Sequence, residues 1–140
     1  MFVLDTTTVM DWIWRKDSTG YADALLGRLE KERAKVHGGW FMELAEGLAN
    51  AERQGIAVAQ VERYRELVLR LPIEIDSPRR DTWVERVLML GRQHGINVAQ
   101  ASNLELAMRE GLPIGSLDAE LRQAAKAVGV EILEVRDDDD

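Results

Sequence analysis

The sequence predicts an α/β domain of three layers, in which a parallel sheet is covered by helices on both faces. Short apolar runs typical of strands alternate with helical segments along the chain, and no hairpin signal interrupts them. Such alternation favours parallel strands joined by helical crossovers. With 140 residues, 46% of them hydrophobic, the chain is expected to fold as a single domain with its own core. We assign residues 1–135 to this domain and residues 136–140, "RDDDD", to a solvated acidic tail.

The expected strands are short apolar runs. The first of them, "FVLD", delivers an aspartate at its C-terminal end. In chain order, strands are expected at Phe2–Asp5, near Val36, at Ile73–Ile75, at Pro113–Gly115 and at Val130–Leu133. The stretch "INV", residues 96–98, is interpreted as a further short strand that leads into a helix.

The helical segments are recognised by apolar residues at helical spacing and by signals at their ends. Val9, Trp12 and Ile13 have this spacing in the first segment, and Gly55 and Gly95 are placed to end later helices. The expected helices occupy residues 8–17, 21–35, 40–55, 57–71, 78–95, 99–111 and 118–129.

The composition excludes several classes of protein. The chain has no cysteine, which excludes a disulfide framework and a thiolate metal site and fits a reducing compartment. No run approaches the ~20 apolar residues of a membrane span, and the N-terminus lacks the basic region of a signal peptide, so a cytoplasmic protein is expected. The net charge of −7 excludes nucleic-acid binding by an overall positive field, so RNA would need a local basic patch or bridging cations.

Three acidic residues are expected at one edge of the sheet. Asp5 and Asp118 follow expected strands, and Glu43 lies in the first turns of a helix. Ligands of open α/β sheets bind outside the carboxyl ends of the strands. Carboxylates brought together there repel one another and raise one another's pKa, and a divalent cation relieves that repulsion. Oxygen ligands of this kind favour Mg²⁺ or Mn²⁺.

Three stretches together resemble the PIN-domain ribonucleases, and within them the VapC-like toxins of toxin–antitoxin pairs. They are "FVLDTTTVMDW", "WFMELAEGLANAERQG" and "ASNLELAMREGLPIGSLDAELRQAAKAVGVEIL". The resemblance implies a parallel sheet of about five strands, usually in a homodimer. It implies an endoribonuclease that binds Mg²⁺ or Mn²⁺ in an acidic pocket and cuts RNA. It also implies a small antitoxin protein as a partner, docked near Trp12–Arg15 of "MDWIWRKD".

The resemblance also assigns roles to individual residues. Asp5, Glu43 and Asp118 match the acids that bind the metal and carry out catalysis. Thr7 matches a small hydroxyl residue that supports the first of these acids. Three of the four expected acids are therefore present.

Gln100 makes the expected site degenerate. It stands where the family normally has an aspartate, and Ala99 replaces the tyrosine that usually precedes it. A glutamine carbonyl can ligate Mg²⁺ but carries no charge, so metal binding is expected to weaken by roughly one to three powers of ten. Glu46 stands where an asparagine is usual, three residues after Glu43 and on the same helix face. Either Glu46 restores the missing charge to the pocket, or it is a solvated surface residue.

Other side chains have both a chemical and a purely structural interpretation. His37 and His94 could act as general bases, although a turn and a helix end also suit them. Tryptophans could stack on bases or could be part of the core or an interface; they are Trp12, Trp14, Trp40 and Trp83. The candidates for phosphate contacts are Arg15, Lys16, Arg79, Arg80 and Arg92.

Three functions are compatible with these observations. The first is a metal-dependent endoribonuclease toxin with reduced or altered metal affinity. The second is a catalytically inactive PIN-like domain that binds RNA or a protein partner. The third is a dimerisation module with no role in nucleic-acid binding. The state of the pocket separates the first two: a retained cluster of Asp5, Glu43 and Asp118 favours the nuclease, because drift after a loss of activity would not spare three acids at separated positions.

Overall fold

The computed structural model describes residues 1–14 and 20–134. Arg15, Lys16 and the expected tail over residues 136–140 lie outside the described residues. In the described part, the elements follow in the order β1 (Phe2–Leu4), α1 (Thr6–Trp14), α2 (Tyr21–Arg28), β2 (Ala34–Val36), α3 (Trp40–Arg53), α4 (Val58–Leu69), β3 (Ile73–Ile75), α5 (Arg80–His94), α6 (Val98–Glu110), β4 (Ile114–Gly115) and α7 (Ala119–Ala127).

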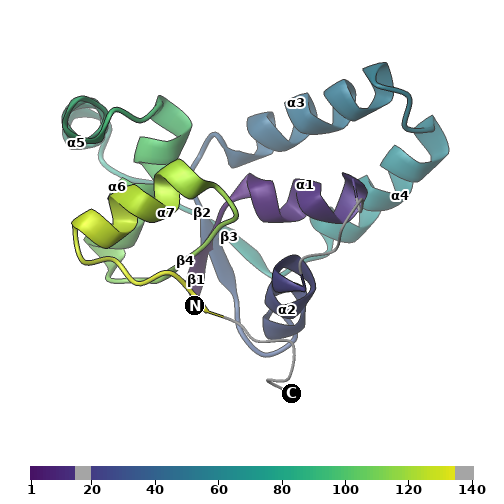
Figure 1. Ribbon diagram of the computed structural model, residues 1–140, viewed down its shortest axis with the longest axis horizontal. Helices are drawn as coiled ribbons and strands as arrows, with labels where there is room; N and C mark the ends of the chain where they lie inside the picture. Colours follow the sequence, from purple (N-terminus) through teal and green to yellow (C-terminus); the bar gives the residue numbers. More distant parts are fainter. Residues whose placement is uncertain (15–19, 135–140) are drawn as a thin grey trace.

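The strands form one parallel sheet in the order β3–β2–β1–β4. In its register, Phe2 of β1 lies opposite Ala34 of β2, and Leu4 lies opposite Gly115 of β4. Helices α1 to α4 gather on one side of the sheet and α5 to α7 on the other (Figure 1). The prediction of an α/β domain with a parallel sheet flanked by helices is therefore confirmed.

The expectation of about five strands is wrong, because the sheet has four strands within the described residues. The segment expected as a strand at Val130–Leu133 makes only one isolated parallel bridge, between Ile132 and Ile114. The two hydrogen bonds between this segment and β4 both involve Ile114, whose N–H donates to the carbonyl of Glu131 and whose carbonyl accepts from the N–H of Leu133. Backbone groups of alternate residues point to opposite sides of a strand, so a strand as short as β4 turns only Ile114 toward this segment.

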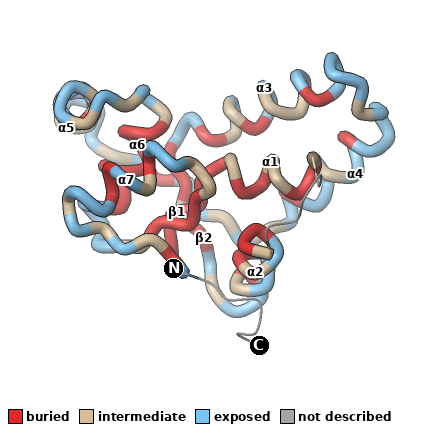
Figure 2. The backbone as a smooth tube through the Cα atoms, in the orientation of Figure 1, coloured by how far each residue is buried: buried red, intermediate tan, exposed pale blue. Residues whose placement is uncertain are grey.

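Strand β1 is buried on both faces. Phe2 and Leu4 belong to the core that packs under α1 to α4, whereas Val3 between them belongs to the core under α5 to α7. All three are fully buried, and the tube in Figure 2 is red along β1 for this reason. Burial on both faces explains why β1 is a continuous apolar run, whereas the edge strand β3 has Glu74 and Ile75 exposed.

Two of the expected element boundaries are wrong. The helix expected over residues 21–35 ends at Arg28, because Ala34–Val36 pairs with strands on both sides as β2. The strand expected in residues 96–98 is absent from the structure, where Asn97 is instead the N-cap of α6. None of the helices in the described part of the chain is long and apolar enough to cross a membrane.

Candidate functional site

Asp5 lies at the carboxyl end of β1, at the edge of the sheet where ligands of such folds bind. It is 4% exposed. Its Oδ2 accepts hydrogen bonds from the hydroxyls of Thr7 at 2.7 Å and Ser116 at 2.6 Å. Its Oδ1 accepts a longer one, of 3.4 Å, from the side-chain amide of Asn103. The acid is thus held by three neutral donors from separate parts of the chain.

The pKa of Asp5 is raised above its ordinary value of 3.8, and burial is the largest cause. The hydroxyls of Ser116 and Thr7 act in the opposite direction and lower it. The negative charges of Asp118 and Glu43 raise the pKa further. These last two effects indicate that Asp118 and Glu43 both lie near enough to Asp5 for their charges to act on it.

Asp118 is the N-cap of α7. Its Oδ1 accepts from the backbone N–H groups of Glu120 and Leu121, at 3.0 and 3.3 Å. Its Oδ2 accepts from the side-chain Nε2 of Gln100 at 2.8 Å. Both oxygens of this carboxylate are therefore engaged, one by the helix it begins and one by Gln100.

Gln100 is held in one orientation by two partners of opposite kind. Its Oε1 accepts from the backbone N–H of Asn97 at 2.9 Å, while the Asn97 side chain accepts from the backbone N–H of Gln100 at 2.8 Å, which together make the capping box of α6. A backbone N–H can only donate and a carboxylate can only accept. The amide oxygen must therefore face Asn97, and the NH₂ group must face Asp118.

This orientation bears on the expectation that the carbonyl of Gln100 could ligate a metal ion, which stays a prediction. The oxygen accepts a hydrogen bond in the capping box, and the group that faces Asp118 is a hydrogen-bond donor. A donor of this kind stabilises the charged form of Asp118 without a cation.

Glu43 lies in the first turn of α3, beside α1 and a buried histidine. Its Oε1 accepts from the hydroxyl of Thr6 at 3.2 Å. Its Oε2 is 2.5 Å from Nε2 of His37, although neither atom makes a hydrogen bond with another described residue. The Nδ1 of His37 accepts from the backbone N–H of Gly39, so in the neutral imidazole the proton is on Nε2 and faces Glu43. His37 thus orients Glu43 and lies beside the acids.

Glu46 is exposed on the next turn of α3. It lines an open hollow with Thr6, Glu43 and Arg53, among others. Glu46 and His37 therefore both lie beside Glu43, Glu46 on the solvent side and His37 on the buried side. Restoration of charge to the pocket by Glu46 stays a prediction.

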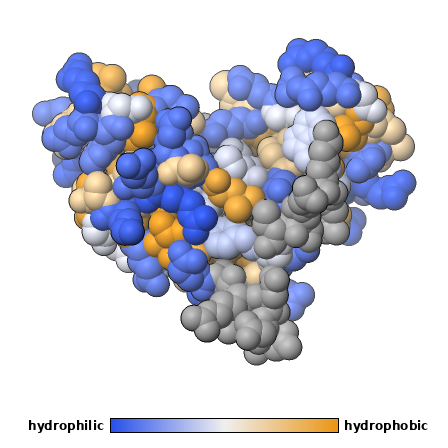
Figure 3. All heavy atoms as spheres, viewed as in Figure 1, coloured by the Kyte–Doolittle hydropathy of each residue, from blue (hydrophilic) through white to orange (hydrophobic). Residues whose placement is uncertain are grey.

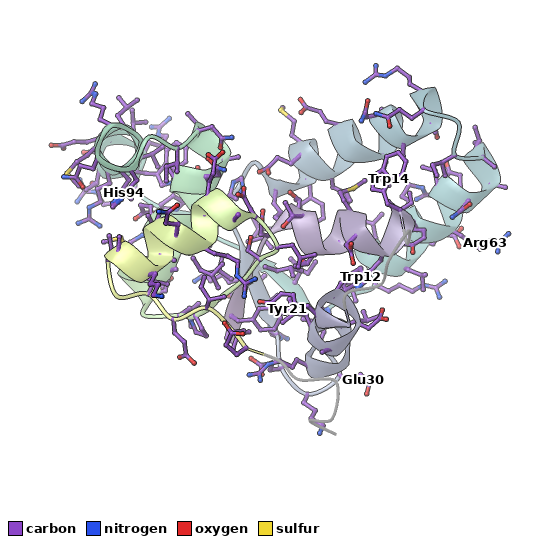
Figure 4. The ribbon with its side chains drawn as sticks, in the orientation of Figure 1. Trp12, Trp14, Tyr21, Glu30, Arg63 and His94 are labelled. Carbon is purple, nitrogen blue, oxygen red and sulfur yellow. The ribbon has the colours of Figure 1, made fainter. Side chains whose placement is uncertain are left out.

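The tryptophans divide between core and surface. Trp40 is fully buried and Trp12 is buried in the core under α1 to α4, so neither is open to a base. Trp14 is half-buried and packs against a small separate cluster, and Figure 4 shows it on a different side of α1 from Trp12, as their spacing predicted. Trp83 is half-buried on α5. His94 is the last residue of α5 (Figure 4), at the helix end that the sequence predicted for it.

The arrangement of these residues does not fit a preformed metal site. Within residues 1–14 and 20–134, no group of three or more His, Cys, Asp or Glu residues is placed to hold a metal ion. Asp118 spends both oxygens on N–H donors, and Gln100 turns its NH₂ toward the pocket.

Two residues of the site were missed in the sequence. Ser116 and Asn103 both donate to Asp5, from positions 111 and 98 residues away. Ser116 had a signal, because it lies in "GSLD" at the end of an expected strand. Asn103 had a weaker one: it lies three residues after Gln100, on the same face of α6. The Oδ1 of Asn103 is buried and has no hydrogen-bond partner among the described residues.

The comparisons with known proteins identify the fold but no family. No model of a protein family and no curated protein matches the sequence. Among solved structures, the chain is similar to PAE2754 from Pyrobaculum aerophilum, with a TM-score of 0.67 over 88% of this chain and 84% of that chain. The two sequences are 18% identical, so the likeness concerns the fold alone.

Proposed function

We propose that this chain is a catalytically inactive PIN-like domain that binds single-stranded RNA at the carboxyl edge of its sheet without a metal ion. The observation that carries the proposal is the hydrogen bond from Gln100 to Asp118. It supplies a neutral donor at the position where the PIN-domain resemblance implies an acid, and with it both oxygens of Asp118 accept hydrogen bonds. A site arranged in this way can bind and orient groups, but it has no group poised to activate water.

Binding of an anionic polymer beside three acids needs a compensating positive potential. Gly39, Arg80 and Val98 line a common hollow next to Glu43, and they lie at the N-terminal ends of α3, α5 and α6. Unpaired N–H groups and the helix dipole make such ends favourable for phosphate. The guanidinium of Arg80 adds a charge that can contact phosphate directly. This local patch is what an acidic protein of net charge −7 requires to bind RNA.

A second candidate is the Mg²⁺- or Mn²⁺-dependent endoribonuclease of a VapC-like toxin–antitoxin pair. It is favoured by the mutual influence of Asp5, Glu43 and Asp118 and by the buried, unpartnered Oδ1 of Asn103 beside Asp5. An acceptor oxygen in that position suits a cation or an ordered water. On this hypothesis, Gln100 would have to release Asp118 before the acids could gather around a metal ion.

The toxin hypothesis also includes a partner and a place for it. A groove of about 340 Å³ is lined by Trp12, Leu26 and Tyr64, among others, and Arg63 lies at its edge (Figure 4). It adjoins the stretch Trp12–Arg15, of which Arg15 lies outside the described residues. An antitoxin segment in this groove, a homodimer and a cytoplasmic location are parts of this second proposal.

Calorimetric titration of Mn²⁺ and a cleavage assay on labelled single-stranded RNA separate the two functions. We expect the wild type to bind RNA equally well in EDTA and in Mn²⁺, to give no cleavage products, and to show no stoichiometric Mn²⁺ binding. Gln100→Asp is expected to gain Mn²⁺ affinity, by roughly one to three powers of ten for the restored charge.

Glu46→Gln and Asp5→Asn are the control variants. If the wild type binds Mn²⁺ and cuts RNA, and Asp5→Asn abolishes both, the endoribonuclease replaces the inactive domain. If Glu46→Gln also weakens that Mn²⁺ binding, Glu46 supplies the charge that Gln100 lacks. A wild type that binds no RNA in either buffer contradicts the proposal.

A further inference from the structure

A largely apolar hollow of about 530 Å³ opens beside Glu43. This volume lies within the ~300–1,000 Å³ of pockets that take small organic ligands. We call it the Trp83 hollow; its walls include Pro78, Trp83, Val84, Val98 and Ala99, its floor includes His37, Glu43 and Ser102, and Arg80 lines it as well. The space-filling view is notched between the part that carries α5 and the part that carries α3, where these elements meet the solvent (Figure 3).

Trp83 gives the hollow a rigid aromatic wall. The residue is half-buried and packs against the core under α5 to α7, which fixes its ring. Ala99 and Val98 opposite it carry short side chains, so space is left beside the indole. An aromatic ring with free space on one side is a stacking platform for another flat ring, and stacking accepts every nucleobase because each has a π-face.

The floor of the hollow contains two polar side chains that face each other. Nε2 of His37 lies 2.5 Å from Oε2 of Glu43, and both atoms are buried. Because Nδ1 of His37 accepts from Gly39, Nε2–H points at Glu43. This pair needs no partner from a ligand, so an aromatic ring can lie over it and against the apolar walls of the hollow.

The charge at the hollow fits the rest of a nucleotide. Arg80 is the first residue of α5, so its guanidinium and the N-terminal N–H groups of the helix lie on the same side of the hollow. A base stacked on Trp83 is joined to a phosphate, and these groups are where that phosphate would find positive charge.

We propose that the Trp83 hollow takes one unstacked nucleobase of single-stranded RNA, stacked on Trp83, with its phosphate near Arg80. The inference rests on the RNA binding proposed above and names the part of the RNA that the site holds.

The test uses a pair of valines that are alike except in position. Val98 is the first residue of α6 and is 58% exposed, and Val58 is the first residue of α4 and is 60% exposed. Only Val98 lines the Trp83 hollow. Val98→Trp fills the mouth of the hollow without disturbing the core, and Val58→Trp is the matched control. Trp83→Leu and the pair Arg80→Ala and Arg79→Ala complete the set.

Affinities are measured by fluorescence anisotropy with a short labelled single-stranded RNA and with the same RNA carrying abasic sites. Nucleoside monophosphates are titrated in parallel and followed by amide NMR signals of Gly38, Gly39 and Ala99. We expect Val98→Trp and Trp83→Leu to bind the intact RNA roughly tenfold more weakly or worse, because one base–aromatic stack is lost. Val58→Trp and Arg79→Ala should bind as the wild type does. The abasic RNA should bind Val98→Trp and Trp83→Leu as it binds the wild type, whereas Arg80→Ala should weaken the binding of both RNAs because it loses a phosphate contact.

The outcomes distinguish failure of this inference from failure of the proposed function. If RNA binds the wild type, Val98→Trp and Trp83→Leu equally, the hollow holds no base while RNA binding stands. If no RNA binds but a monophosphate shifts the signals of Ala99 and Gly39, the hollow is a nucleotide site and the RNA-binding function is wrong. If neither binds, both are wrong. If the wild type sediments as a dimer that Val98→Trp dissociates, a second copy of the chain covers the hollow, and the inference is overturned.

Discussion

Gln100 is a single neutral side chain that joins two helix N-termini and an acid. It closes the capping box of α6 with Asn97 and donates to Asp118, the N-cap of α7. No other residue type makes both contacts with the same shape, because one end must accept from a backbone N–H and the other must donate to a carboxylate. The amide of Gln100 is therefore required by the hydrogen bonds of this site, and it replaces the acid that the PIN-domain resemblance led us to expect there.

Gln100→Glu tests this role because it keeps the shape and the capping contact but replaces the donor with an acceptor. We expect it to lower the free energy of unfolding by about 1–3 kcal/mol near neutral pH, since two carboxylates then face each other. Mn²⁺ should restore part of the loss. Urea unfolding with and without Mn²⁺ measures both effects, and Gln123→Glu, at an exposed position of α7, is the control. A Gln100→Glu variant as stable as the wild type in EDTA would contradict the assigned contact.

Asp5 predicts a pH dependence of stability. Burial raises the pKa of Asp5 above 3.8, so the folded protein holds this proton more tightly than the unfolded chain does. Between the unfolded and folded pKa values the unfolded chain binds fewer protons, and stability falls as the pH rises through this window.

Asp5→Asn cannot lose a proton and should remove this part of the dependence. We expect the unfolding free energy of the variant, relative to the wild type, to increase from about pH 4 toward neutral pH. Urea titrations across that range measure the difference, and Asp81→Asn, an exposed position, serves as the comparison. A relative stability that falls with rising pH would show that the pKa of Asp5 is lowered instead.

At the scale of elements, the start of α7 depends on Asp118. Its Oδ1 caps two backbone N–H groups, and its Oδ2 joins α6 through Gln100. Asp118→Ser keeps a capping oxygen but cannot reach Gln100, whereas Asp118→Ala loses both contacts. We expect the alanine variant to be less stable than the serine variant by about 1 kcal/mol. Thermal unfolding measures this step, and equal stability of the two would mean that the cap contributes nothing.

Helix α6 is joined to the end of β3 by a buried ionic network. Arg109 contacts Asp76, which follows β3, and Glu105 one turn earlier on its own helix. Both acids are buried, and they hold the pKa of Arg109 above its ordinary value. Removal of one partner from such a network leaves buried charge uncompensated.

Arg109→Met is therefore expected to lower the free energy of unfolding by about 3 kcal/mol or more. Arg65→Met removes an ion pair with Glu62 on the exposed face of α4 and should cost far less stability, because solvent screens this pair. Chemical denaturation of both variants at about pH 7 compares a buried with an exposed pair. Equal losses would mean that Lys35, which also lies near Asp76, replaces Arg109.

At the scale of the molecule, exposed apolar side chains on α5 predict self-association. Leu88 and Met89 are each 45% exposed, and the sequence led us to expect a homodimer. Leu88→Glu should shift a dimer toward monomer at tens of micromolar without changing the far-UV spectrum, because the position is at the surface. Sedimentation equilibrium measures the shift. A wild type that is monomeric at this concentration would remove the homodimer from the proposal.

The sequence by itself determined the fold class and the edge at which the site lies. Strands were expected at β1, β3 and β4, where the structure has them, and near Val36 for β2, although the first residues of β2 were expected in a helix. A strand buried on both faces, such as β1, is a continuous apolar run. Parallel strands end at the same edge, so Asp5 and Asp118, which follow β1 and β4, were placed there from spacing alone. These features depend on the local pattern of apolar residues and on the order of strands and helices along the chain, and both can be recognised in the sequence.

Only the tertiary structure decided what the site contains. Asn103 and Ser116 reach Asp5 across 98 and 111 residues, and no local pattern records such a contact. The direction of the Gln100 amide depends on Asn97 on one side and Asp118 on the other. A reversed amide would turn its oxygen, which can ligate a cation, toward the acids in place of its NH₂ group. The prediction of a fifth strand was wrong for a similar reason. Its pairing depended on β4, which is only two residues long and turns few backbone groups toward it. Hydrogen bonds between distant residues are directional, and direction is fixed only when the whole chain has packed.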